Sequence, residues 1–143
     1  MQKFYEIHDS LLESLDQQGD RVSIRLRAVR TEIGKGGPTA PHHFRQEIRL
    51  VLDGAQLTID SPNLPSWLLE GSFLCETSDA EKADCGAKGA IPGSLASAQN
   101  VELVLAGLHE GSGDFVTIHV KANSLALQQL GEPQSLQYTR ASI

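Results

Sequence analysis

The stretch RVSIRLR, residues 21–27, decides the fold class of this chain. Its apolar residues, Val22, Ile24 and Leu26, alternate with arginine and serine. Successive side chains of a β-strand point to opposite faces, so this alternation gives one apolar face and one polar face. An amphipathic helix would instead need apolar residues at every third or fourth position. The stretch therefore predicts a strand with one face buried and the other in water.

The same alternation recurs on both sides of three turn signals, and each combination predicts an antiparallel hairpin. The strongest of these signals is an Asp-Gly pair at residues 53–54. The predicted hairpins join residues 11–15 to 21–27, residues 48–52 to 57–59, and residues 101–105 to 116–120.

The remaining segments are less regular. We expect the last strand to continue past a bend at Asn123, and a turn at residues 131–133 to precede a short closing strand at residues 136–138. Residues 64–69 fit one helical turn at most, because Gly71 follows too soon for a longer helix. Two segments rich in small and polar residues are predicted loops, residues 34–43 and 77–100.

Together these elements predict a single all-β, mainly antiparallel domain over residues 1–143, with about seven or eight strands and at most one short helix. A parallel sheet would need crossover helices between its strands, and the sequence has no segments for them. A β-sandwich and a partly closed barrel both remain open, because both require the same alternation.

The charge balance bears on the partners of the protein. A formal net charge of −6 and a sequence pI near 5.3 argue against nucleic acid as a ligand, since nucleic-acid binders present basic surfaces. No apolar stretch is long enough to span a membrane, and the N-terminus lacks the apolar run of a signal peptide. We therefore expect a cytoplasmic protein in which Cys75 and Cys85 are free thiols, with a disulfide between them as the alternative.

His42, His43, Cys75 and Cys85 are weak candidates for a zinc site. Their spacing argues against it, because zinc ligands usually pair a few residues apart, whereas these histidines are adjacent and the cysteines lie ten positions apart, since 85 − 75 = 10. No phosphate-binding loop, dinucleotide fingerprint or nucleophile motif occurs, so we expect neither metal nor cofactor.

His8, Asp9 and Ser10 are the residue types of a hydrolytic triad, but they are contiguous. A triad is assembled by the fold, and adjacent strand residues point to opposite faces. We interpret Asp9 or Ser10 as a residue that caps or bends the chain as it enters the first strand, with His8 bonded to a neighbouring backbone group.

Several arginines, Arg21, Arg25, Arg27, Arg45 and Arg49, could align on one sheet face and bind carboxylates or phosphates. The favoured alternative is that they pair across strands with glutamates. These glutamates would be Glu13, Glu32 and Glu47.

Trp67 is the single tryptophan and lies in an apolar segment. We expect it to plug one end of the core. The alternative is an exposed apolar patch suited to a partner or to self-association.

The opening of the chain, residues 7–12 with a Gly-Asp turn and an alternating strand after it, resembles small uncharacterised bacterial β-proteins that begin with a similar His-Asp element. The ending, from Phe115 through residues 130–133 to Tyr138, is similar to the way such chains close. Some of these proteins are assigned as immunity proteins that bind secreted toxins. The resemblance implies a protein partner and assigns no residue a role.

These observations favour a non-enzymatic protein-binding module, with the immunity type as its specific form. An acidic antidote facing a basic toxin would gain association rate from charge complementarity. A small-ligand-binding or enzymatic β-domain with a pocket between sheets, and a homodimeric structural subunit, remain alternatives. The candidate binding residues are His8, Asp9, Arg25, Arg27, Arg49 and Trp67.

Overall fold

The computed structural model describes residues 2–33, 42–60, 64–76, 89–92 and 97–136. This part of the chain contains eight strands and no helix, so it has no helix that could span a membrane. The strands are β1 (Gln2–Gln18), β2 (Arg21–Ile33), β3 (His42–Asp53), β4 (Gln56–Asp60), β5 (Ser66–Glu76), β6 (Ala90–Pro92), β7 (Ser97–His109) and β8 (Phe115–Ser135).

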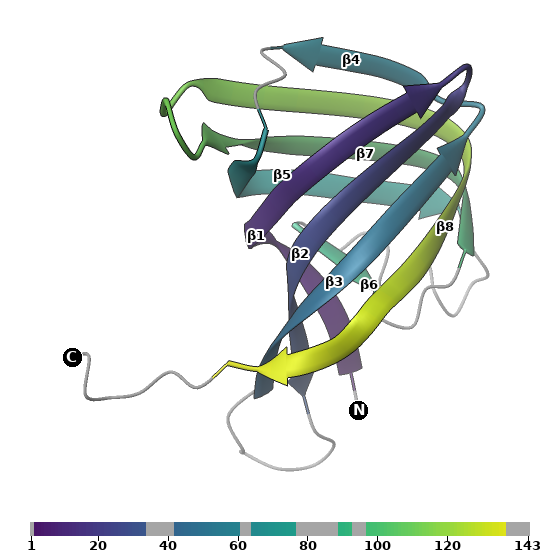
Figure 1. The fold of residues 1–143 in the computed structure, drawn as a ribbon. Coiled ribbons are helices and arrows are strands. Elements are labelled where there is room, and N and C mark those ends of the chain that lie inside the picture. The colour runs from purple at the N-terminus through teal and green to yellow at the C-terminus, as the bar shows by residue number, and fades with distance from the viewer. Residues whose placement is uncertain (1, 34–41, 61–63, 77–88, 93–96, 137–143) are drawn as a thin grey trace.

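The strands pair into one ring-like antiparallel sheet (Figure 1). Pairing runs from β1 through β2, β3, β8, β7 and β5, and returns from β5 to β1. Two residue pairs make this last connection, Leu11 with Trp67 and Leu12 with Ser66. The all-β, antiparallel class and the strand number predicted from the sequence are confirmed, and the strands form a single sheet that curls on itself.

The first and third predicted hairpins are confirmed. β1 and β2 pair on either side of the turn at Gly19, with Leu15 opposite Ile24. β7 and β8 pair with Leu103 opposite Val120. As expected, β8 continues past Asn123 as one long strand.

The second predicted hairpin is wrong, because β3 and β4 do not pair with each other. Both pair with β8, β3 through residues 124–135 and β4 through residues 117–121. Figure 1 shows β8 curving between these two halves. Gly54 has a positive φ of 63°, and a Cβ there would overlap the Asn123 side chain. Residues 53–54 therefore form a corner that follows the bend of β8.

Three other expectations need correction. Residues 66–69, expected in a helical turn, belong to β5 because that segment pairs with β1 and β7. Residues 131–133 are not a turn but a bulge within β8, held by the Gln46 amide, which donates to the carbonyls of Leu130 and Gly131 at 3.2 and 3.1 Å. Parts of the two predicted loops are strands, namely His42 and His43 in β3, β6, and the start of β7. Residues 34–41, 77–88 and 137–143 lie outside the described residues.

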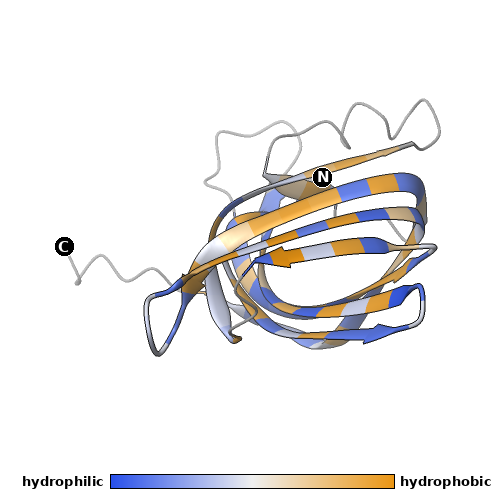
Figure 2. Ribbon diagram, turned by 90° about the horizontal axis from the view of Figure 1, so that it is seen from above, coloured by the Kyte–Doolittle hydropathy of each residue, from blue (hydrophilic) through white to orange (hydrophobic). Residues whose placement is uncertain are grey.

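The inner face of the ring is the hydrophobic core. Val22, Ile24 and Leu26 are at most 1% exposed, as the alternation in β2 predicts. Each such side chain contributes roughly 1.5–3 kcal/mol by leaving water. Figure 2 shows hydrophobic and hydrophilic residues alternating along the strands. The arginines that alternate with these apolar residues of β2, Arg25 and Arg27, lie on the outer face of the ring.

Candidate functional site

A wide bulge interrupts β1 where the His8-Asp9-Ser10 motif lies. β1 and β2 pair at Glu6 with Val29, and pair again at Leu11 with Arg27. Between these two pairs β1 contains residues 7–10, whereas β2 contains a single residue, so the surplus residues of β1 leave the ladder.

Ser10 fixes this bulge from the inside. Its side chain is fully buried, and its Oγ donates to the carbonyl oxygen of Glu6. The same Oγ accepts a hydrogen bond from the backbone N–H of Val29 at 3.3 Å. These bonds satisfy polar groups that the bulge would otherwise leave unpaired. Ser10 therefore fixes an irregularity of the chain, but within β1 and not at the entry to the first strand, where it was expected.

Asp9 and His8 point into solvent on the outer side of the bulge. Asp9 has a positive φ of 67°, which aspartate tolerates better than most residues. The side chains of His8 and Asp9 are 66% and 69% exposed, and their Nδ1 and Oδ2 atoms lie 3.2 Å apart. Ser10 is buried against backbone groups, so these three residues form no catalytic relay.

An apolar row lies on the outer surface beside the bulge. Trp67 on β5 pairs with Leu108 on β7, and Leu108 pairs with Phe115 on β8. The three residues are 38%, 37% and 57% exposed, and we call them the Trp67 patch. The expectation that Trp67 plugs the core is wrong, because its neighbours Ser66 and Leu68 occupy the inner face.

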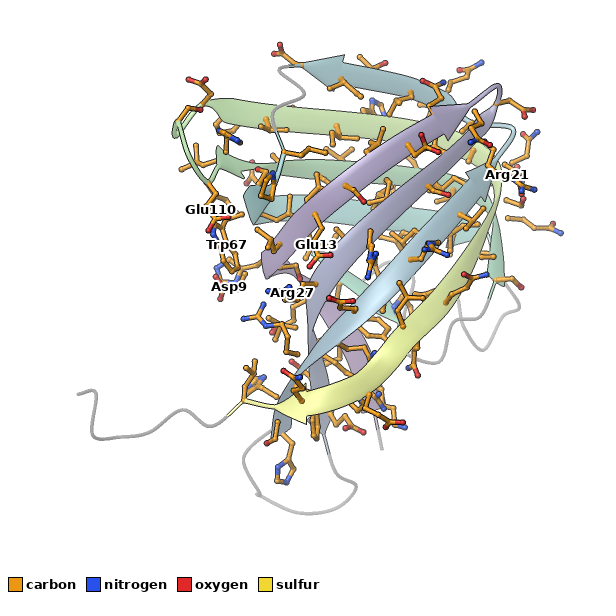
Figure 3. All side chains as sticks on the ribbon, viewed as in Figure 1. Asp9, Glu13, Arg21, Arg27, Trp67 and Glu110 are labelled. Atoms are coloured by element: carbon orange, nitrogen blue, oxygen red, sulfur yellow. The ribbon has the colours of Figure 1, made fainter. Side chains whose placement is uncertain are left out.

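Arg45 connects the patch to the bulge. Its guanidinium carbon lies 5.9 Å from the centroid of the Trp67 ring, within cation–π range. Its Nη1 donates to the carbonyl oxygen of Asp9 at 3.5 Å. Arg45 forms no ion pair with a carboxylate of the described residues. Figure 3 shows Trp67 between Asp9 and Glu110 at one end of the ring.

A hollow of about 530 Å³ on the outer surface adjoins Arg45. One side is formed by Arg27, Arg45 and Glu47, and the other by the β8 bulge with Leu130 and Leu136. The lining combines Leu130 and Leu136 with Arg45, and it also contains the carboxylates of Glu47 and Glu132. Arg45, which forms no ion pair among the described residues, is the group there that could bind a small anion.

The arginine-rich face is largely neutralised, as the favoured reading predicts. Arg27 Nε lies 3.1 Å from Glu13, and Arg25 Nη2 donates to Glu47 at 2.9 Å. This hydrogen bond raises the pKa of Arg25 above its ordinary value. Arg49 lies directly opposite Arg25 and has no ion pair among the described residues.

The weak metal candidates do not form a thiolate site. Cys75, at the end of β5, is disulfide-bonded, so the expectation of a free thiol is wrong for Cys75, and Cys85 lies outside the described residues. His43 Nδ1 lies 3.1 Å from the hydroxyl of Thr31, with His42 beside it at the start of β3. Within the described ranges, no three histidine, cysteine or acidic residues gather as a metal site.

The structure thus brings together three of the residues singled out from the sequence, namely His8, Asp9 and Trp67. Arg45, Leu108 and Phe115 complete the site. Arg45 was expected only as one arginine of a sheet face, and none of the three was among the candidate binding residues. A signal for two of them existed, because Leu108 and Phe115 are out of phase with the inward residues of their strands. Arg27 lies at the edge of this site, whereas Arg25 and Arg49 lie elsewhere on the outer face.

Comparison of the chain with protein-family models, curated proteins and solved structures finds no match. The fold and the site therefore define a structural class only: the chain is an all-β protein whose ring-like sheet carries an exposed aromatic patch beside an arginine.

Proposed function

We propose that this protein is a non-enzymatic protein-binding module that holds its partner on the Trp67 patch. The observation that carries the proposal is the exposed row of Trp67, Leu108 and Phe115, with Arg45 stacked on the tryptophan. Tryptophan and arginine are the residues most often found at energetic hot spots of protein interfaces. Aromatic side chains are also enriched at interface cores relative to the rest of a protein surface.

The charge around the patch favours a basic partner. Asp9 and Glu110 flank Trp67, and the chain as a whole has a formal net charge of −6. Complementary charge accelerates association and makes it sensitive to salt. An immunity-type role, in which this protein neutralises a basic toxin, is the specific form of the proposal.

Binding by variants tests the proposal. A partner is first captured from host cells on the immobilised protein, and its Kd is then measured with the purified pair. Trp67→Ala should weaken binding by about 30-fold or more, the loss typical of a hot-spot residue. Leu74→Ala is the matched control, because Leu74 is 50% exposed at the other end of β5. An affinity unchanged by Trp67→Ala would contradict the proposal.

Salt provides a second readout. Raising the salt from about 0.05 M to about 0.5 M should slow association markedly, because it screens charges on the two surfaces. Association that is indifferent to salt would remove the argument for a basic partner while leaving the Trp67 patch in place.

The hollow beside Arg45 favours a second candidate function, the binding of a small apolar anion. This candidate differs from a pocket between sheets, because the hollow lies outside the ring. A thermal shift with small aromatic or aliphatic carboxylates, present with the protein and absent with Arg45→Gln, would support it over a protein partner.

The cytoplasmic location stays a prediction. The disulfide at Cys75 weighs against it, because disulfides persist mainly in oxidising compartments. Fractionation of host cells, followed by detection of the protein in each fraction, decides between the cytoplasm and an oxidising compartment.

A further inference from the structure

Two strand edges border an opening in the wall of the ring. β1 pairs with β5 only at Leu11 and Leu12, so its edge from residue 13 to residue 18 has no partner among the described strands. β4 pairs with β8 along one edge, and no described strand pairs with its other edge. The two edges meet where the N–H of Ala55 donates to the carbonyl of Asp20 at 2.8 Å. Figure 1 shows β1 and β4 diverging from this point, and we call the region the β1–β4 opening.

The core is incompletely covered at this opening. Leu57 and Ile59 on β4 are paired with fully buried residues of β8 and therefore face inward. Leu15 on β1 faces inward for the same reason, because it is paired with Ile24. All three nevertheless stay partly exposed. An extended segment with apolar side chains on one face would bury them.

The charged residues along the two edges are all acidic. Residues 13–18 and 56–60 contain Glu13, Asp16 and Asp60 and no basic residue. Glu13 is engaged by Arg25 and Arg27. The other two carboxylates form no ion pair within the described ranges, so they are available to cations of an incoming segment.

We propose that the β1–β4 opening binds an extended segment of a basic partner by strand addition. The segment pairs its backbone with the free edges, places alternate apolar side chains over Leu15, Leu57 and Ile59, and turns lysine or arginine toward Asp16 and Asp60. Strand addition takes its affinity from main-chain hydrogen bonds and its specificity from alternate side chains. This inference rests on the proposed function, and it adds a mode of recognition and the chemistry of the bound segment.

A synthetic peptide of about seven residues, with lysine and valine alternating, is the probe. Its binding is followed through the backbone amide signals of the isotope-labelled protein. We expect shifts at residues 13–18 and 56–60, and slower hydrogen exchange of amides there when the peptide is present. Shifts confined to other strands or to the Trp67 patch would overturn the inference.

Backbone pairing is tested with two N-methylated forms of the same peptide. One form is methylated at two alternate residues, whose N–H groups point to one side of the extended peptide. The other form is methylated at two residues whose N–H groups point to the opposite side. Each of the two methylated peptides should bind about 30-fold more weakly than the unmodified peptide, the factor that two net hydrogen bonds represent. Equal affinity for all three peptides would overturn strand addition.

Charge is tested by variants and by a second peptide. Asp16→Asn with Asp60→Asn should weaken the lysine peptide, whereas Asp114→Asn, in the exposed loop before β8, should leave it unchanged. A peptide of alternating glutamate and valine should not bind. Amide protection at β4 that grows with protein concentration in the absence of peptide would identify a second copy as the occupant and overturn the inference. If Trp67→Ala loses partner binding but the peptide does not bind the edges, strand addition is overturned and the proposed function is still supported.

Discussion

Gly107 on β7 lies so close to the backbone of Trp67 on β5 that a Cβ at Gly107 would overlap the Trp67 carbonyl group. The close approach holds the two strands together beneath the Trp67 patch. Gly107→Ala should therefore destabilise the fold by about 1–3 kcal/mol or more, because backbone atoms on both strands would have to move. Urea denaturation measures this loss. Gly111→Ala is the control, since its nearest neighbour is the end of the His109 side chain and not backbone. Equal stability of both variants would contradict this packing.

Ser10→Ala should cost roughly 1–3 kcal/mol, because it leaves the buried N–H of Val29 without an acceptor. Ser14→Ala, at an exposed position of the same strand, should change stability by less than about 0.5 kcal/mol. Thermal or urea unfolding of both variants tests the assignment. If the two variants were equally stable, Ser10 would not be what holds the bulge.

The strands are predictable from the sequence because alternation is local. Val22, Ile24 and Leu26 face the core for a reason contained in a few neighbouring residues. Partner choice is different, since residues 53–54 have the chemistry of a hairpin turn and yet form a corner. That corner depends on the bend of β8 at Asn123, which is remote in sequence.

In the candidate site, too, local features are predictable from the sequence and long-range contacts are not. The exposure of His8 and Asp9 depends on a bulge whose register no local pattern contains. The contact of Arg45 with Trp67 joins β3 to β5, two strands that do not pair with each other, so no local pattern in the sequence contains it. The sequence therefore singled out both Trp67 and Arg45, but it did not predict the contact between them.

Acid should weaken the fold through Glu102. Contact with His119, at 3.2 Å, and with Lys121 lowers the pKa of Glu102 below its ordinary value of 4.5. The stabilising contribution of a carboxylate with a lowered pKa is complete above pH 4.5 and is lost as the pH falls through the folded-state pKa. Glu102→Gln should therefore be less stable than the parent protein at about pH 6, and the difference should be smaller at about pH 2, below the ordinary value of 4.5.

Thermal melts at the two pH values measure this difference. Glu70→Gln serves as the control, because Glu70 is exposed and has no ion pair in the described part of the chain. A stability difference for Glu102→Gln that is independent of pH would exclude its carboxylate as the cause.

The disulfide at Cys75 should contribute to stability. Its removal by Cys75→Ser is expected to cost about 2–3 kcal/mol, at the lower end of the usual range, because the two cysteines of the chain are close in sequence. Titration of the purified, unfolded protein with a thiol reagent should find no free thiol before reduction and two after it. Two reactive thiols without reduction would contradict the bridge.

Photo-crosslinking in the host tests the central claim most directly. A photoreactive phenylalanine analogue replaces Phe115 in one strain and Leu74 in another, and the cells are illuminated. Binding through the Trp67 patch predicts a discrete crosslinked product, larger than this chain by the mass of another protein, from position 115 and none from position 74. No product from position 115, or the same products from both positions, would contradict binding at the patch. A product twice the mass of the chain would instead identify a homodimer.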